Sequence, residues 1–303
     1  MNTVTIFEGA DGAGKTTLIE ALAPRVKATV FHHGTYPGEM HIARHYLASL
    51  KAACDGPVFM DRSWLAEPIY GRAFRNGEDR VGVAARRMLE RVALSLGAVV
   101  VRCAPSFDVC AEAFARRRAL HGEYLDTKAQ LRAVYHGYQE DLRTDVPVID
   151  FDYTSQSAPD LWRRIEVVRP KVNDGPGIGR WAPGEVTLLV GDRMNSHGGD
   201  LDLPFISFNR GGCSAWLAEA LEATEVPERD LYWVNARGLD GVAIKAEFVG
   251  MLKPKQVIAL GAAARTWCAT NRVLHATVPH PQFWKRSKST APYPLLGLLQ
   301  EAL

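Results

Sequence analysis

The sequence EGADGAGKTT occupies residues 8–17 and directly follows the apolar run VTIF at residues 4–7. Its spacing, G-x-x-x-x-G-K-T, is that of a phosphate-binding loop, and residues 17–23 have the composition of the helix that should follow such a loop. Glycines let successive backbone N–H groups turn toward phosphate oxygens at the positive end of that helix. The alternative is a glycine-rich turn that matches by chance, but strand, loop and helix signals occur in the required order.

The loop predicts which residues hold a nucleoside triphosphate. Lys15 is expected to reach the β- and γ-phosphates, and Thr16 is expected to ligate the metal ion, Mg²⁺. ATP and Mg²⁺ are therefore the predicted phosphate donor and metal cofactor. The residues expected to bind ATP are Gly9, Asp11, Gly12, Gly14, Lys15, Thr16 and Thr17.

Composition limits the possible classes of protein. The chain has 303 residues, of which 47% are hydrophobic, so it can form one large or two ordinary packed domains. Its net charge is +2, from 36 Lys and Arg against 34 Asp and Glu, and this balance gives no evidence for or against nucleic acid. No apolar run reaches the roughly 20 residues of a membrane span, so neither an anchor nor a signal peptide is expected.

The cysteines indicate a reducing compartment. The five cysteines are far apart in sequence, and none belongs to a C-x-x-C pair, which argues against a disulfide framework or a zinc site. A cytoplasmic location is therefore expected. These residues are Cys54, Cys103, Cys110, Cys213 and Cys268.

The first half of the chain alternates between strand and helix patterns. The run GAVVVRC at residues 97–103, which is apolar except for Arg102, is typical of a strand buried on both faces of a parallel sheet. Strands are expected at residues 4–7, 28–32, 57–60, 97–103 and 146–151, and helices at residues 17–23, 40–50, 80–96, 107–118 and 127–144.

Two charged residues, Asp61 and Arg62, follow the third of these strands. Ligands bind at the carboxyl ends of strands in an open α/β sheet, so both side chains are expected beside the γ-phosphate. Asp61 would orient an attacking hydroxyl or accept its proton, and Arg62 would hold phosphate charge. The alternative is a structural ion pair at a strand end.

An arginine cluster lies between the last two helices of this half. The first of them begins near Phe107 and ends in Arg116-Arg117-Arg118, and residues 122–125 interrupt the helical pattern. Such a flap can bring guanidinium groups onto the transferring phosphate, for which Arg116 and Arg117 are the candidates. The alternative is a basic helix end that is only solvated.

Residues 1–168 resemble the thymidylate kinase group of nucleoside monophosphate kinases in the opening loop, the Asp61-Arg62 pair and the flap. The resemblance implies a five-stranded parallel sheet and a pyrimidine nucleotide, or something like it, as acceptor. Two departures weaken free thymidylate as the acceptor: residues 35–39 replace the usual Arg-Glu-Pro-Gly-Gly, and Gly71 replaces a glutamine. The implied acceptor-binding residues are Tyr36, Trp64, Tyr70 and Arg72.

A Gly- and Pro-rich stretch at residues 169–184 resists helix and strand, and we expect a domain boundary there. The predicted organisation is a kinase domain at residues 1–168, a linker at residues 169–184 and a second domain at residues 185–303. In the second domain, strands are expected at residues 186–190, 232–235, 256–261 and 276–281. The predicted fold class is α/β, with a P-loop kinase-type parallel sheet and a second, smaller α/β domain.

The order of motifs over residues 186–303 resembles the uracil-DNA glycosylase superfamily. The resemblance places Asp192 in the loop after the first strand and Phe205 against an extruded base. It places Asn235 at the pyrimidine edge, although an Asn after a strand is also a common turn residue. It places His280 in a loop that enters the minor groove.

Two features of the second domain qualify this resemblance. Residues 193–195 and Gln282 depart from the usual motifs, so we expect the domain to bind a base without cleaving it. Lys285 and Arg286 lie beside aromatic residues in the run FWKRSK, at residues 283–288, a combination that suits DNA. An exposed basic loop is the alternative for that run.

Together, the halves predict an ATP-dependent kinase that phosphorylates a hydroxyl on a pyrimidine deoxynucleotide. The expected acceptor is 5-hydroxymethyluracil within DNA, which makes DNA and ATP the partners and a virus acting in the host cytoplasm a plausible source. One alternative is a nucleoside monophosphate kinase fused to a DNA glycosylase domain. Another is a DNA-binding module that is only switched by a nucleotide.

Overall fold

The computed structural model describes residues 3–34, 38, 42–121, 127–193, 212–238, 240–287 and 291–301. The chain forms two compact units. The first unit contains Met1–Gly82 and Leu96–Pro170, and the second contains Val83–Ser95 and Lys171–Leu303. Within the described residues, none of the helices has the length and apolar character needed to cross a membrane.

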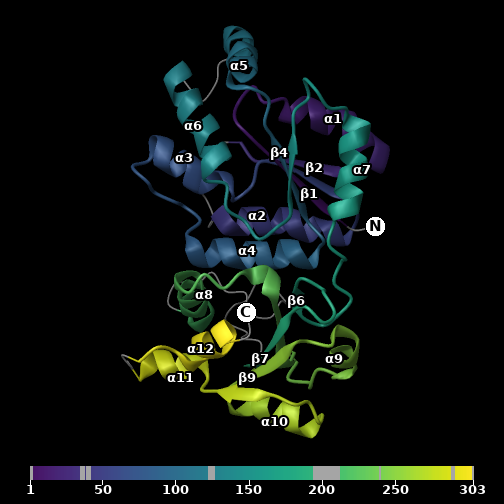
Figure 1. The fold of residues 1–303 in the computed structure, drawn as a ribbon, viewed down its shortest axis with the longest axis vertical. Coiled ribbons are helices and arrows are strands. Elements are labelled where there is room, and N and C mark those ends of the chain that lie inside the picture. Colours follow the sequence, from purple (N-terminus) through teal and green to yellow (C-terminus); the bar gives the residue numbers. More distant parts are fainter. Residues whose placement is uncertain are drawn as a thin grey trace. The chain divides into compact units, whose positions relative to one another are not determined.

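The first unit contains a five-stranded sheet in the order β2-β3-β1-β4-β5, with neighbouring strands parallel (Figure 1). This confirms the predicted parallel sheet. The carboxyl ends of β1, β2 and β3 therefore meet at one edge, which is where the phosphate-binding loop begins. The strands are β1 (Val4–Glu8), β2 (Thr29–His32), β3 (Val58–Asp61), β4 (Val99–Cys103) and β5 (Val148–Phe151).

Six helices described in the first unit surround this sheet. Helices α1 and α7 lie beside each other next to this sheet (Figure 1). Their apolar side chains pack against Phe7, Phe59 and Val101 in one core cluster. A second cluster joins α3, α5 and α6 through side chains such as Ile69 and Phe114. The helices are α1 (Lys15–Val26), α2 (Ile42–Lys51), α3 (Ala66–Phe74), α5 (Phe107–His121), α6 (Lys128–Glu140) and α7 (Ala158–Val168), with a short 3-10 turn at Ala52–Cys54.

The second unit contains another five-stranded sheet, in the order β10-β9-β7-β8-β6. Strands β10, β9, β7 and β8 are parallel, and only β6 pairs in the antiparallel direction, with β8. A second α/β sheet is thus present, as predicted. The strands are β6 (Ile178–Gly179), β7 (Thr187–Arg193), β8 (Leu231–Arg237), β9 (Gln256–Leu260) and β10 (Ala276–Val278).

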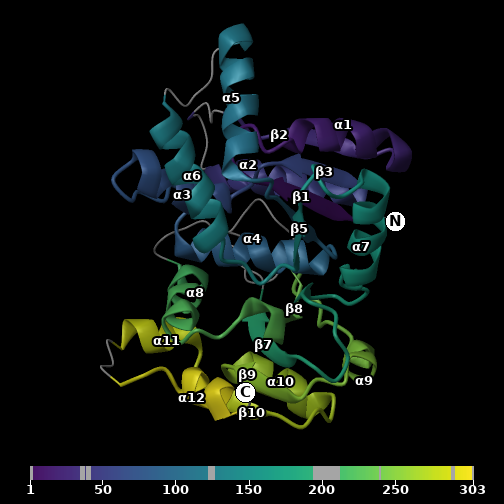
Figure 2. The same ribbon diagram turned by 45° about the horizontal axis from the view of Figure 1, so that its top comes forward.

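The helices of the second unit pack on its sheet and on one another. Helix α10 contacts β7 and β9, and α8 lies beside α11 (Figure 2). The core includes Tyr232, Phe248 and Trp267. The helices are α4 (Val83–Ser95), α8 (Cys213–Ala223), α9 (Glu247–Leu252), α10 (Ala262–Thr270), α11 (Pro281–Arg286) and α12 (Pro294–Glu301), with a 3-10 turn at Glu228–Asp230.

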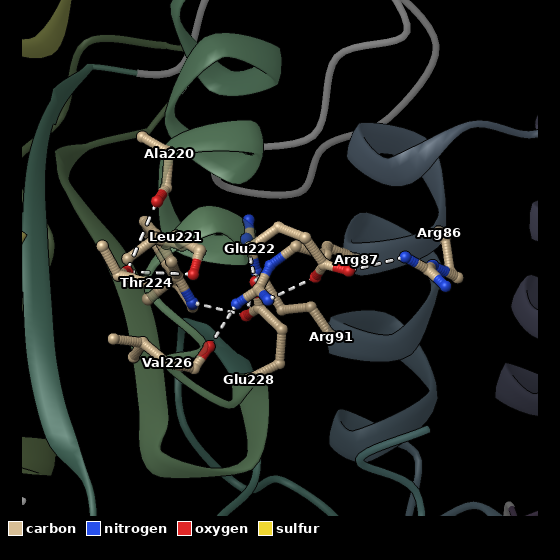
Figure 3. Close-up of polar contacts among 10 residues, drawn as sticks. Arg86, Arg87, Arg91, Ala220, Leu221, Glu222, Thr224, Val226 and Glu228 are labelled. Atoms are coloured by element: carbon tan, nitrogen blue, oxygen red, sulfur yellow. Dashed lines mark hydrogen bonds and ion pairs between the residues drawn. The ribbon is translucent and has the colours of Figure 1, made fainter. Parts of the chain in front are cut away.

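Helix α4 corrects the predicted organisation, because residues from the first half of the sequence belong to the second unit. Arg91 is 2% exposed and donates to both carboxylate oxygens of Glu228, at 3.0 and 2.8 Å. Arg87 donates to Glu228 at 3.1 Å and to Glu222 at 3.0 Å (Figure 3). These ion pairs hold α4 against α8, which carries Glu222, and against the 3-10 turn Glu228–Asp230 that precedes β8. Composition does not reveal this long-range pairing.

The predicted linker at residues 169–184 is also corrected, since part of it is built into the second unit. Ile178 and Trp181 are buried, and Ile178–Gly179 forms strand β6. The hydroxyl of Tyr232 donates to Asn173 at 2.8 Å and accepts from the backbone N–H of Gly177 at 3.1 Å. Glycine is required at 177 because a Cβ there would lie 2.2 Å from the Trp233 carbonyl oxygen. The glycines of this stretch therefore serve close packing.

Several predicted boundaries differ by a few residues. Helix α6 begins at Lys128 because Thr127 forms a capping box with Gln130, and it ends at Glu140 instead of residue 144. Strand β5 begins at Val148, after Pro147, which has no N–H to donate. Strands β7 and β8 extend beyond their predicted ends because their pairing continues to residues 193 and 237.

Candidate active site

The phosphate-binding loop has the backbone that its sequence predicts. Gly12 and Gly14 have φ angles of 78° and 82°, in the region that favours glycine. A Cβ at Gly12 would lie 2.3 Å from the Cys110 carbonyl oxygen, and one at Gly14 would lie 2.8 Å from the Tyr153 ring. The loop therefore requires glycine at both positions, and it delivers the chain into α1 at Lys15.

Lys15 and Thr16 begin helix α1. Lys15 is 6% exposed, and its Nζ donates to the carbonyl oxygens of Gly9 and Ala10 at 2.8 and 2.9 Å. Burial lowers the pKa of this amine from its usual range. Thr16 donates its hydroxyl hydrogen to Asp61 Oδ2 at 3.1 Å. A threonine hydroxyl at this position fits a Mg²⁺ ion, which binds few protein oxygens and completes its shell with phosphates and water.

A cavity of about 420 Å³ lies over the loop and α1 within the first unit. Arg117 from α5 lines one side, and Tyr153 and Gln156, in the segment after β5, line another. Arg117 is the flap arginine that the sequence predicts at this place. Tyr153 and Gln156 were not predicted from the sequence, although their position at the end of the last predicted strand could have indicated them. The remaining lining residues are Gly12, Gly14, Lys15, Thr16, Thr17, Leu18, Ala21, Ala113, Phe151 and Ala158.

Asp61 is the last residue of β3 and is held from two sides. Besides the Thr16 hydroxyl, it contacts Nδ1 of His32, which lies 3.1 Å from Asp61 Oδ2. His32 is the last residue of β2 and stands directly opposite Asp61 in the parallel register. The His32 side chain is 59% exposed, whereas that of Asp61 is 12% exposed. The sequence analysis placed a strand end at residue 32 but did not consider this imidazole.

Arg62 has a left-handed backbone, with φ at 72°, which is uncommon for a residue with a side chain. Its guanidinium pairs with Asp11 of the loop and donates to the Tyr70 hydroxyl at 2.5 Å. Tyr70 in turn donates to Asp11 at 3.2 Å. Burial alone would raise the pKa of the Asp11 carboxyl, but the charges of Arg62 and Lys15 hold it below its usual range. Three predicted residues thus form one network beside the loop.

Glu8 joins three segments of the site through one buried carboxylate. It is fully buried and accepts hydrogen bonds from Ser63 at 2.6 Å and from the Tyr138 hydroxyl of α6 at 2.9 Å. Burial raises the pKa of Glu8 to about 7. The loop, the segment after β3 and the flap helix α6 are therefore connected at a group that titrates near neutral pH.

Four other predicted residues lie elsewhere or outside the described residues. Trp64 is fully buried and packs beside Tyr46, so its ring is not presented to a ligand in this structure. Arg72 pairs with Asp141 at 3.0 Å. Arg116 is exposed and lies 3.8 Å from Glu112, so the structure does not bring it to the cavity lining. Tyr36 lies outside the described residues.

The second unit brings three predicted residues to the carboxyl edge of its sheet. Asp192 Oδ2 lies 3.8 Å from His280 Nε2, and its other oxygen accepts from the Ala264 N–H at 3.0 Å. Asn235 is 6% exposed and belongs to β8, where its neighbour across the pair is Gly191. Asp192 and Asn235 thus lie within strands, not in the loop and strand end that the sequence predicts. Phe205 lies outside the described residues.

The basic residues of the second unit are on helix α11. Lys285 and Arg286 occupy its last turn, and Phe283 on the same helix is 66% exposed. Trp284 and Tyr293 pack together, with ring centroids 6.0 Å apart. One aromatic side chain of this run is therefore presented to solvent beside two cations, and the other is used for packing.

Comparison with known proteins finds similarity only among solved structures. No family model matches the sequence, and no curated protein matches it. The YorR protein from Bacillus subtilis, in complex with phosphorylated GDP, is 17% identical, covering 55% of this chain and 95% of its own, with a TM-score of 0.44. Deoxyadenosine kinase from M. mycoides with bound dCTP is 15% identical, covering 55% of this chain and 98% of its own, with a TM-score of 0.37. The sequence identities and TM-scores are low, so the functional argument depends on the geometry of the site.

Proposed function

We propose that the protein is an ATP- and Mg²⁺-dependent phosphotransferase acting on a nucleotide-like acceptor. The observation that carries the proposal is the loop geometry: Lys15 and Thr16 open a helix behind positive-φ glycines, and Thr16 contacts Asp61 of the neighbouring strand. Backbone N–H groups at such a helix start bind phosphate. The cavity over the loop supplies room for the rest of the nucleotide.

Residues of the first unit have different roles in the proposed phosphate transfer. Lys15 exchanges its two backbone carbonyl partners for phosphate oxygens, and Arg117 neutralises charge on the transferring group. Tyr153 and Gln156 line the cavity over the loop, where they would contact the base and sugar of ATP. Thr16 holds Mg²⁺, which when bound offsets phosphate charge. Asp61, which accepts from Thr16 beside the loop, would orient the attacking hydroxyl.

We assign a hydroxyl on a pyrimidine base in DNA, most specifically 5-hydroxymethyluracil, as the acceptor. Support comes from the second unit, where Asp192, Asn235 and His280 come from three segments to one sheet edge. Such an edge suits capture of an extruded base, which costs a few kcal/mol in unstacking and needs contacts to its polar edge. Lys285 and Arg286 provide cations for the phosphate backbone.

The test is a transfer assay with γ-labelled ATP. The protein is incubated separately with thymidylate, plain duplex DNA and duplex DNA containing 5-hydroxymethyluracil, and Lys15→Ala serves as the inactive control. Label that enters only the hydroxymethylated DNA supports the proposal. Label on thymidylate alone supports the monophosphate kinase alternative, and binding of DNA without any transfer supports the nucleotide-switched module.

A further inference from the structure

The chemistry of the acceptor decides what the site must contain. The oxygen of a nucleoside monophosphate has already lost its proton near neutral pH, since the second pKa of a phosphate monoester is about 6. An alcohol keeps its proton until it attacks, so a kinase for alcohols gains rate from a positioned general base. A base at the acceptor side of the loop therefore indicates a hydroxyl acceptor.

The pair formed by His32 and Asp61 meets this requirement. Asp61 Oδ2 lies 3.1 Å from His32 Nδ1 and also accepts from Thr16, so the carboxylate is fixed relative to the phosphate-binding loop. A carboxylate at Nδ1 fixes the tautomer and leaves Nε2 as the nitrogen that can accept a proton. Because the His32 side chain is 59% exposed, this nitrogen is on a ring that an acceptor can approach.

The neighbouring histidine does not serve the same role. His33 is 6% exposed, its ring contacts His45 Nε2 at 2.9 Å and Ser49 Oγ at 3.2 Å, and burial lowers its pKa to about 4. It is consequently held inside the unit. Of the two adjacent imidazoles, only His32 combines an exposed ring with a carboxylate partner.

We infer that His32 is the general base of the transfer, that Asp61 positions it, and that the acceptor is consequently an alcohol and not a phosphate. The inference rests on the proposed function. In the step, His32 Nε2 takes the acceptor O–H proton while the oxygen forms a bond to the γ-phosphorus. The bond between that phosphorus and the bridging oxygen of ADP breaks, and ADP leaves with the electron pair. The imidazolium that remains is stabilised by Asp61.

Several charged and titratable groups lie around His32. Asp61 faces it from β3, and His33 is its chain neighbour. Glu20 of α1 and Lys27, which directly follows α1, line a second cavity beside β2 together with His32. Burial raises the pKa of Glu8 to about 7, so a Glu8 variant is included in the test to separate its contribution from that of His32.

The test compares pH–rate profiles on duplex DNA containing 5-hydroxymethyluracil. His32→Asn keeps an amide near the Nδ1 position for Asp61 but removes the proton acceptor. We expect a fall in kcat of about 100-fold or more and loss of the rise in rate with increasing pH, with KM for ATP unchanged. His136→Asn is the matched control, because this histidine is 54% exposed and lies 3.7 Å from Glu140. The Glu8→Gln variant is expected to keep the rise in rate with increasing pH that depends on His32.

The outcomes separate the inference from the proposed function. If the wild-type protein phosphorylates the DNA and His32→Asn retains its rate and pH profile, the assignment of His32 is wrong while the function stands. If the wild-type protein labels thymidylate and no hydroxyl acceptor, the proposed function is wrong as well. A fall in rate for His136→Asn equal to that for His32→Asn would also overturn the assignment.

Discussion

Replacement of Arg91 by alanine should destabilise the second unit strongly. Arg91 donates two hydrogen bonds to Glu228, at 3.0 and 2.8 Å (Figure 3). Its guanidinium also lies 3.9 Å from the centre of the Trp233 ring. Glu228 is fully buried. Although burial alone would raise its pKa, the charges of Arg91 and Arg87 hold the pKa of this carboxyl below its usual range. The alanine variant would leave a buried carboxylate with fewer partners.

The size of the expected loss in unfolding free energy depends on the partners that Glu228 keeps in the variant. Removing one partner of a buried ion pair costs about 3 to 5 kcal/mol. Arg87 and the Trp233 Nε1–H still donate to Glu228, both at 3.1 Å, so the lower part of that range applies. We expect a loss of about 3 kcal/mol in the free energy of unfolding at neutral pH. Because the pKa of Glu228 is depressed in the folded state, this contribution is present above the ordinary pKa and is lost as the pH falls toward the folded value.

The assay is urea denaturation at neutral pH together with hydrogen exchange of the amides in β8. Arg180→Ala is the control in the same unit, because Arg180 pairs with the exposed Glu185 and such pairs contribute about 0 to 1 kcal/mol. The double variant Arg91→Ala with Glu228→Gln should recover part of the loss, since it no longer buries an ionised group. A loss for Arg91→Ala no larger than that for Arg180→Ala would refute the assignment of α4 to this network.

The other predictions concern the two sites. Lys15→Ala and Asp61→Ala should each reduce phosphoryl transfer at least about 100-fold in a labelled-ATP assay. The first variant lacks a phosphate contact, and the second lacks the carboxylate that orients the acceptor. Unimpaired transfer by Asp61→Ala would contradict the role of Asp61. Burial raises the pKa of Glu8 to about 7 in the folded protein, against an ordinary value of 4.5. The free energy of unfolding of the wild-type protein should therefore fall by about 3 kcal/mol relative to that of Glu8→Gln as the pH rises from 4.5 through 7. Parallel plots of unfolding free energy against pH for the two proteins would contradict this. Asn235→Ala should lower activity on duplex DNA by roughly 5- to 150-fold, because it removes a contact worth about 1 to 3 kcal/mol. ATP binding should be unchanged, and the loss of activity on single-stranded DNA should be smaller. Equal losses of activity on duplex and single-stranded DNA would contradict base capture. The full chain should bind uracil-containing DNA without releasing the base, and abasic sites would show that Asp192 and His280 retain excision.

The features that were predictable from sequence depend on local signals. The phosphate-binding loop combines a strand, three glycines, Lys15 and a helix within about twenty residues, and each part confirms the others. The strand at residues 99–103 is apolar except at Arg102, because helices cover both sides of a parallel sheet. Such patterns need no knowledge of distant partners.

The features that the sequence did not reveal depend on distant partners. Helix α4 has the periodicity of any amphipathic helix, and only the buried pairing of Arg91 with Glu228, 137 positions away, assigns it to the second unit. The Gly- and Pro-rich segment read as a linker because its packing against Tyr232 is not encoded locally. His32 was overlooked because its importance arises from the register that places it opposite Asp61.

The central claim is that phosphate is transferred from ATP to a hydroxyl on a base in DNA. The most direct measurement digests 5-hydroxymethyluracil-containing duplex DNA after incubation with the protein and ATP, and locates the added phosphate by mass spectrometry of the recovered nucleosides. We predict that the hydroxymethyl group of the base gains one phosphoryl group in the presence of the wild-type protein and not of Lys15→Ala. Unmodified bases in that DNA, together with conversion of thymidylate to its diphosphate, would contradict the account.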